Sequence, residues 1–287
     1  MIRKAAMRCC LPLRRLTRMI YDTSLAQRYN QIRPGYPPQY LEAIVRATGG
    51  EPATRQQTLL DLASGSGQVV ETCGHLFGRV VATDISPAMC ELVRDRAEAK
   101  GMSVQCIASA SEDLASLPEP VQADVVIGGQ CLHWMALPRF WQTLRKILPP
   151  GGTFICSFYG PNFRFVGGAG SEATRRRANE LLPSLYEAIG HALPNSNLFV
   201  AHFDDYAFPF AKVERERIAW RRSLTFAQVA HFTRTGAALN CYNKMYAAPY
   251  DVDGFLESLR AALGGVADDA AFEIEWTITV VTCKEMQ

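Results

Sequence analysis

The chain has 287 residues, 48% of them apolar, so it is long enough to bury a full hydrophobic core. Its 30 basic and 28 acidic residues leave a net charge of +2, which gives no electrostatic argument for binding nucleic acid or an anionic membrane. No apolar run approaches the roughly 18 residues of a membrane span, and the nine cysteines contain no CxxC pair, which argues against zinc and for a reducing compartment. We therefore expect a soluble protein whose partner is a small molecule.

Residues 1–20 differ from the rest, because all of their charges are basic. In a helix these charges would lie on one face and the apolar side chains opposite, which resembles a mitochondrial targeting segment, although Pro12 interrupts the helix. A disordered basic tail, or translation that begins at Met19, explains the pattern equally well. We expect the cytoplasm, with the mitochondrial matrix as the alternative.

Strands and helices are predicted to alternate from Thr58 onward, after a short helix at 25–32, an extended turn at 33–38 and a helix at 39–48. Such alternation is typical of a doubly wound α/β fold, a Rossmann-like parallel sheet with right-handed crossovers. The predicted strands lie near 58–63, 79–84, 103–108, 123–128 and 152–158, and the predicted helices near 67–77, 87–100 and 137–147.

The pattern changes after residue 160. Three glycines, at 167, 168 and 170, suggest a flexible join, and mostly helical segments follow. The last strand, rich in β-branched residues, is predicted to insert antiparallel and complete a seven-stranded sheet. Helices are predicted near 172–192, 225–235 and 251–263, and strands near 206–213 and 273–284. The predicted domains are the leader 1–20, a core at 21–160, a mostly helical substrate cap at 161–250, and a C-terminal helix and strand at 251–287 that complete the core.

The most informative motif is DLASGSGQV at 61–69, which follows a short buried strand. Residues 64–67 are small, as they must be where backbone approaches a ligand closely. Asp84 ends the next predicted strand, where a carboxylate can accept both hydroxyls of a ribose. Strand, glycine turn, helix, strand and acid together indicate an adenosine-binding site.

The glycine loop differs from two common nucleotide motifs. It has neither the GxGxxG of dinucleotide-binding enzymes nor a GxxxxGK[ST] phosphate cradle. A ligand without a pyrophosphate, a nucleoside with a zwitterionic tail, fits better. S-adenosyl-L-methionine has that chemistry and is the predicted cofactor.

The sequence resembles the class I S-adenosylmethionine-dependent methyltransferases, in particular the small-molecule group that includes fungal trans-aconitate methyltransferase. The segments that carry the resemblance are YNQIRPGYP at 29–37, DLASGSG at 61–67, CLHWMALPRFWQTLRKILPPGG at 131–152, WRRSLTFAQVAHFTRTG at 220–236 and EIEWTITVVTCKE at 273–285. The resemblance implies a cofactor site made of Asp61, Ser64, Gly65 and Gly67 at the methionine end, Asp84 at the ribose, and Ala110, Ser111 and Glu112 at the adenine.

Two positions depart from the pattern of that group. Ala63 stands where the group usually has its first glycine, and a negative φ would make it tolerable. Gly236 and Ala237 stand where a tryptophan–serine pair is common, which bears on the identity of the substrate.

Two clusters are candidates for contacting the methyl acceptor or the cofactor carboxylate. Arg33, beside Tyr29 and Tyr36, offers a guanidinium fork for a carboxylate, although it would equally suit a surface turn. We expect Tyr29 to contact the cofactor, and Arg33 and Tyr36 to contact the substrate. At the carboxyl end of the fourth strand, Gln130, His133 and Trp134 lie where doubly wound sheets bind ligands. His133 is the candidate base or orienting group, and a histidine bonded to backbone is the structural alternative.

These observations predict methyl transfer from S-adenosyl-L-methionine to a small-molecule acceptor, most simply a carboxylate or other oxygen, by in-line displacement without a metal. Two alternatives use the same scaffold. One is a non-catalytic or assembly-factor protein that retains the fold, and the other is a C-methyltransferase or hydroxylase.

Overall fold

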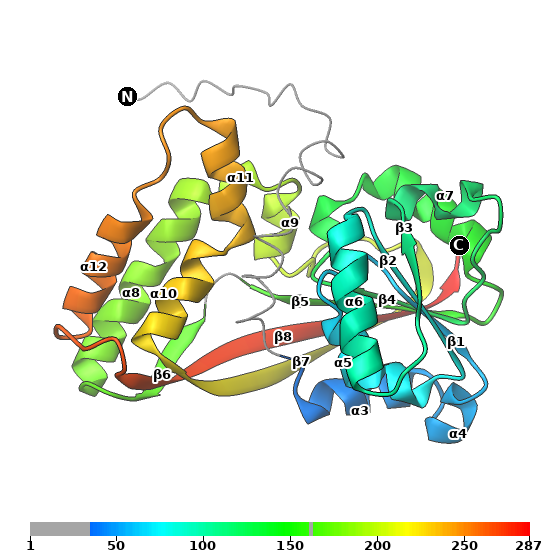
Figure 1. Cartoon of the computed structure of the whole chain (residues 1–287), viewed down its shortest axis with the longest axis horizontal. Coiled ribbons are helices and arrows are strands. Elements are labelled where there is room, and N and C mark those ends of the chain that lie inside the picture. Colours follow the sequence, from blue (N-terminus) through cyan, green and yellow to red (C-terminus); the bar gives the residue numbers. More distant parts are fainter. Residues whose placement is uncertain (1–34, 161–162) are drawn as a thin grey trace.

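The computed structural model describes residues 35–160 and 163–287 (Figure 1). The predictions made for the leader 1–20, for the helix at 25–32, and for Tyr29 and Arg33 lie outside these residues.

The parallel part of the sheet contains five strands in the order β3-β2-β1-β4-β5. Most of their residues are buried, as is typical of strands covered by helices on both faces. Their bounds are β1 (Thr58–Asp61), β2 (Arg79–Asp84), β3 (Gln105–Ala108), β4 (Val125–Gly129) and β5 (Thr153–Tyr159). The Rossmann-like fold predicted from the sequence is confirmed.

Helices cover both faces of this sheet. Helices α3 (Pro38–Ala47), α5 (Gln68–Cys73) and α6 (Pro87–Ala99) contribute to one hydrophobic cluster, and α7 (Leu137–Ile147) to a second. The apolar residues of α7 recur every three or four positions, so they form one buried stripe that packs on Phe154. Shorter elements are α4 (Glu51–Thr54), η1 (Gly74–Leu76), η2 (Ser111–Ser116) and η3 (Leu132–Trp134).

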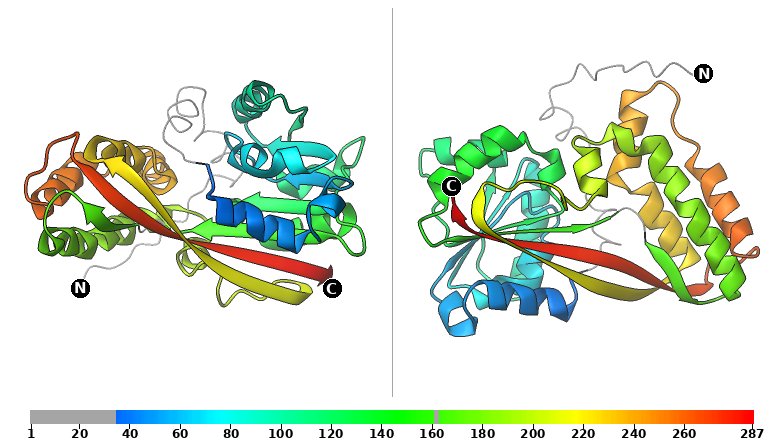
Figure 2. Two further views of the ribbon diagram at one scale, coloured as in Figure 1. Left: turned by 90° about the horizontal axis from the view of Figure 1, so that it is seen from below. Right: turned by 180° about the vertical axis from the view of Figure 1, so that it is seen from behind.

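Two long antiparallel strands run from the core into the cap (Figures 1 and 2). β7 (Phe210–Thr225) pairs with β8 (Ala271–Met286) over the whole length of both. On its other side, β8 pairs first with β6 (Arg164–Gly168) and then with β5. The C-terminal strand is therefore antiparallel, as predicted, and lies in the interior of the sheet.

Within the described residues the sheet has eight strands, whereas seven were predicted. β6 was missed because Gly167 and Gly168 in its second half favour a loop, and its pairing is irregular between Phe165 and Gly167. β7 was predicted only as 206–213, because charged residues fill most of its exposed positions.

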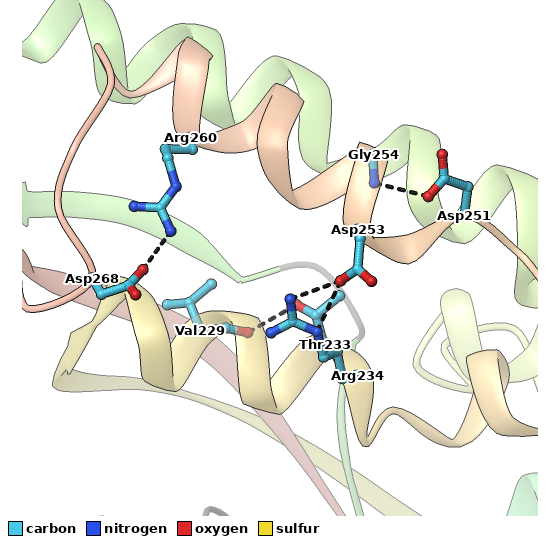
Figure 3. A network of polar contacts seen from close by, with 8 residues as sticks. All are labelled: Val229, Thr233, Arg234, Asp251, Asp253, Gly254, Arg260 and Asp268. Carbon is cyan, nitrogen blue, oxygen red and sulfur yellow. Dashed lines mark hydrogen bonds and ion pairs between the residues drawn. The ribbon is translucent and has the colours of Figure 1, made fainter.

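Most of the cap helices gather at one end of the β7–β8 pair (Figure 1). They are α8 (Glu172–Ile189), η4 (Gly190–Ala192), α9 (Ser196–Val200), α10 (Phe226–Arg234), α11 (Ala237–Met245) and α12 (Val252–Ala262). An ion pair between Arg234 and Asp253 joins α10 to α12 (Figure 3). A second, between Arg260 and Asp268, joins α12 to the segment before β8. Helix α12 packs against α8 and α10 through its apolar face. The predicted domain boundaries stay a prediction. No helix in the described ranges is long and apolar enough to cross a membrane.

Candidate functional site

Three residues of the loop between β1 and α5 have a left-handed backbone conformation. Ala63, Gly65 and Gly67 all have positive φ, of 46°, 55° and 87°. The Ser64 amide donates to the Thr83 carbonyl at 2.8 Å, and the Gly67 amide donates to the Ser64 carbonyl at 2.9 Å. The condition under which alanine would be tolerable, a negative φ, is not met at Ala63, because these anchors bend the chain at that position.

Asp84 is fixed against this loop. One carboxylate oxygen accepts the backbone N–H of Gly65 at 3.0 Å, and the other accepts that of Ser86 at 2.8 Å. Burial raises the pKa of Asp84 to about 6, and the hydrogen bonds from the backbone at Ser86, Gly65 and Ile85 oppose that rise. A carboxylate has about four acceptor sites, so acceptor capacity remains on Asp84 for a ligand hydroxyl group.

Asp61, at the end of β1, is fully buried, and neither of its carboxylate oxygens has a hydrogen-bond partner among the described residues. Burial raises the pKa of Asp61 to about 8, and the charge of Asp84 adds to the rise. The nearby Ser64 hydroxyl opposes the rise only in part, because it donates to the backbone carbonyls of Asp61 and Thr83 and not to the carboxylate. A buried acid without a partner is costly to the fold. A ligand ammonium group would satisfy it, and the amino-acid end of S-adenosyl-L-methionine carries one.

The predicted adenine residues follow β3. Ala110 and Ser111 are buried. A carboxylate oxygen of Glu112 accepts the backbone N–H of Ala136 at 2.8 Å, and so supports the start of α7. The role of these three residues at an adenine stays a prediction.

A mostly apolar cavity lies between the carboxyl edge of the sheet and the cap. The empty space inside it is about 900 Å³, including the part that is open to solvent. The described lining residues are Gln130, His133, Trp134, Tyr159, Gly160, Phe163, Leu182, Leu185, Tyr186, Ile189, Leu193, Phe199, Phe232, Thr233, Gly236, Ala237, Ala238 and Leu239. Three predicted residues, Gln130, His133 and Trp134, therefore come together, and so do the two small residues at 236 and 237.

His133 is only 4% exposed, and its ring centroid lies 4.3 Å from that of Phe199 on α9 and 5.4 Å from that of Trp134. Its Nδ1 atom has no hydrogen-bond partner in the described chain. Burial lowers the pKa of His133 to about 3, so the ring is neutral at physiological pH. The alternative of a ring bonded to backbone through Nδ1 is not what the structure shows.

Gln130 lies just after β4 with a positive φ of 56°, a strained backbone for this residue type. Its backbone N–H donates to the Ser157 carbonyl at 2.9 Å, and its side-chain nitrogen donates to the Tyr159 carbonyl at 2.9 Å. The side-chain oxygen makes no hydrogen bond within residues 35–160 and 163–287.

Tyr36 lies outside the described lining of the cavity. Its ring stacks on Tyr40 with centroids 4.0 Å apart, and a Cβ at Gly129 would lie only 2.6 Å from its hydroxyl oxygen. The prediction that Tyr36 binds the substrate stays untested. The sequence did not single out Phe199, Tyr186 and Phe232, because aromatic residues in predicted helices are more often core residues than ligand contacts.

No three His, Cys, Asp or Glu side chains of the described chain are grouped as metal ligands. The sites that the geometry offers are thus a cradle around Asp61 and Asp84, and the neighbouring cavity.

Comparison with known proteins shows which proteins parts of this chain resemble. Residues 60–156 match a family model described as a methyltransferase domain. The tRNA 5-carboxymethoxyuridine methyltransferase of Escherichia coli K12 is 32% identical over 149 residues, 50% of this chain and 53% of that protein. A ubiquinone biosynthesis O-methyltransferase of Cereibacter sphaeroides is 32% identical over 105 residues, 36% of this chain and 42% of its own. The chain thus spans about half the length of these curated relatives.

A solved structure with the same fold is that of a putative type II methyltransferase from Anaeromyxobacter dehalogenans. It has a TM-score of 0.64 and 23% sequence identity, over 88% of this chain and 97% of that one. This likeness concerns the fold alone, and it includes the cap as well as the core.

Proposed function

We propose that this chain, which contains a class I S-adenosyl-L-methionine-dependent methyltransferase domain, transfers the cofactor's methyl group to an oxygen of a small molecule held in the cavity between core and cap. The observation that carries the proposal is the cradle at the carboxyl ends of β1 and β2. There a buried carboxylate without a partner, Asp61, adjoins a carboxylate fixed by the glycine loop, Asp84.

The cofactor would supply a methyl group on a positively charged sulfur. In this assignment Asp61 pairs with its ammonium group, Asp84 accepts its ribose hydroxyls, and the loop from Ser64 to Gly67 leaves room for its amino-acid end. Methyl transfer of this kind needs alignment of three atoms more than it needs acid or base chemistry. The protein's main contributions are therefore to hold the acceptor in line and to keep water out of the cavity.

The cavity supports a small-molecule acceptor. Its lining comes from both the sheet edge and the cap helices, and most of it is aliphatic or aromatic. The relative from Escherichia coli is named for a tRNA substrate, and the absence of a nucleic-acid partner stays a prediction here. The narrower likeness to trans-aconitate methyltransferase is likewise a prediction.

The test combines binding with a screen of acceptors. Calorimetric titration of the full chain with S-adenosylhomocysteine should show one site. Incubation with cofactor labelled at its methyl group, together with a panel of small carboxylic acids, phenols and alcohols, should then give a labelled small product. Bulk tRNA serves as a comparison arm. Absence of S-adenosylhomocysteine binding, or label found only in tRNA, would contradict the proposal.

A further inference from the structure

The cavity also indicates the chemical class of the acceptor. We infer that the methyl acceptor is an uncharged hydroxyl group, a phenol or an alcohol, on a largely apolar frame, and is neither a carboxylate nor a phosphorylated compound. The inference rests on the proposed function, because it names the substrate class of the same site.

The first observation is the absence of charge in the lining. Among the described residues that line the cavity there is no Lys, Arg, Asp or Glu. A carboxylate bound there would lose its hydration and gain no opposite charge from the described lining, which is unfavourable. Tyr186 contributes a buried hydroxyl without a partner, but one neutral donor does not replace a cation.

The second observation is the orientation of the Gln130 amide. Its nitrogen is occupied by the Tyr159 carbonyl, so the group that remains for a ligand is the amide oxygen. An amide oxygen only accepts hydrogen bonds. A hydroxyl can donate to it, whereas a carboxylate oxygen would be repelled by it.

The third observation concerns His133, which lines the same cavity. Its ring is packed between Phe199 and Trp134 and is neutral, so it offers no positive charge to an anion. Neutral imidazole keeps a lone pair. Transfer to a hydroxyl forms the new O–C bond and breaks the S–C bond, whose electron pair stays on sulfur. His133 can accept a hydrogen bond from the hydroxyl, but its lowered pKa makes the ring a weak base. The hydroxyl proton therefore leaves to solvent, to which the cavity is partly open.

All three observations disfavour an anionic acceptor, and each rests on different atoms of the lining. The aliphatic and aromatic walls favour an apolar frame, Gln130 requires a donor, and the uncharged lining penalises an anion. A neutral hydroxyl on a ring or chain meets all of these conditions.

The test uses the full chain saturated with S-adenosylhomocysteine and two pairs of probes matched in shape: phenol with benzoate, and 2-naphthol with 2-naphthoate. Calorimetry should show the hydroxyl member of each pair binding about tenfold or more tightly than its carboxylate. Stronger binding of the carboxylates would overturn the inference and would point to a cation from outside the described residues, such as Arg33. Failure of all four probes to bind would also contradict it.

Two variants sharpen the result. Leu185→Lys places a cation in the lining and should move the preference toward the carboxylates by about tenfold. Val200→Lys, at an exposed position on α9, is the matched control and should leave the preference unchanged. An unaltered preference in a folded Leu185→Lys variant would contradict the assignment of this cavity. Because S-adenosylhomocysteine binding is measured first, its loss would count against the proposed function instead.

Discussion

The backbone N–H of Gly65 donates to a carboxylate oxygen of Asp84 across a distance of 3.0 Å, so the glycine loop and the acid at the end of β2 brace each other before any ligand binds. The same carboxylate accepts from Ser86 through its other oxygen. The geometry of the ribose site therefore depends on both oxygens of one side chain.

Asp84→Asn should weaken S-adenosylhomocysteine binding by about tenfold to a hundredfold, a loss of about 1–3 kcal/mol. The amide nitrogen of asparagine must face the N–H of either Gly65 or Ser86, where it cannot accept. Calorimetry measures the affinity, and circular dichroism checks that the fold is retained. The exposed Asp95→Asn is the charge-matched control and should bind like the unmodified chain. Equal affinity in both variants would remove Asp84 from the site.

Asp61→Asn should make the stability of the unliganded protein less dependent on pH. The folded-state pKa of about 8 lies above the ordinary value of 3.8, so folding is favoured by the protonated form. That contribution is complete below about pH 4 and is lost as pH rises toward 8. The melting temperature of the variant relative to the unmodified chain should therefore be higher at pH 8 than at pH 5.

The same Asp61→Asn variant should bind the cofactor more weakly, because its amide cannot neutralise an ammonium group. A gain in stability at pH 8 combined with a loss of affinity is the expected pair of results. If the difference in melting temperature between the variant and the unmodified chain were the same at pH 5 and pH 8, Asp61 would have an ordinary pKa in the folded chain.

Ala63→Gly should stabilise the protein by about 1 kcal/mol. The residue has a φ of 46°, which costs an alanine roughly that much and costs glycine little. Urea denaturation measures the change. Ala53→Gly, in the helix α4, is the control and should be destabilising, because glycine there only adds freedom to the unfolded chain. Destabilisation at position 63 as well would mean that the loop carries no strain there.

Ala237→Phe should fill part of the cavity and reduce the affinity of the best acceptor at least about tenfold, while S-adenosylhomocysteine affinity stays within about twofold. The exposed Ala248→Phe adds the same ring outside the cavity and should change neither. If Ala237→Phe left acceptor binding intact, the acceptor would bind elsewhere. Equal losses for cofactor and acceptor would indicate damage to the fold.

The parallel core and the cofactor cradle could be predicted because their signals are local. The strand before Asp61, the glycines after it and the acid at Asp84 lie close together in the sequence, and the structure joins them by direct hydrogen bonds. Even here, the sign of φ at Ala63 was left open, because it depends on the anchor that Thr83 provides from the next strand.

The cavity could be predicted only in part. Gln130, His133 and Trp134 follow a predicted strand end, and that position alone placed them at the site. The opposite wall comes from helices α8 to α11. Which side of each helix faces the cavity depends on tertiary packing, including the long β7–β8 pairing, and not on the local sequence. No local pattern marks Tyr186 or Phe199 as lining residues, since a helix face that lines a cavity and one that packs in a core have the same periodicity.

The interior position of β8 has a consequence for the order in which the protein folds during synthesis. This strand leaves the ribosome after every other strand of the sheet, yet it must lie between β5 and β7. Until it arrives, the growing chain exposes the edges of both neighbours, which are surfaces prone to aggregation. Because contacts between distant parts of a chain form slowly, completion of the sheet is expected to be the slow step, with early release before residue 271 leaving a chain that depends on chaperones.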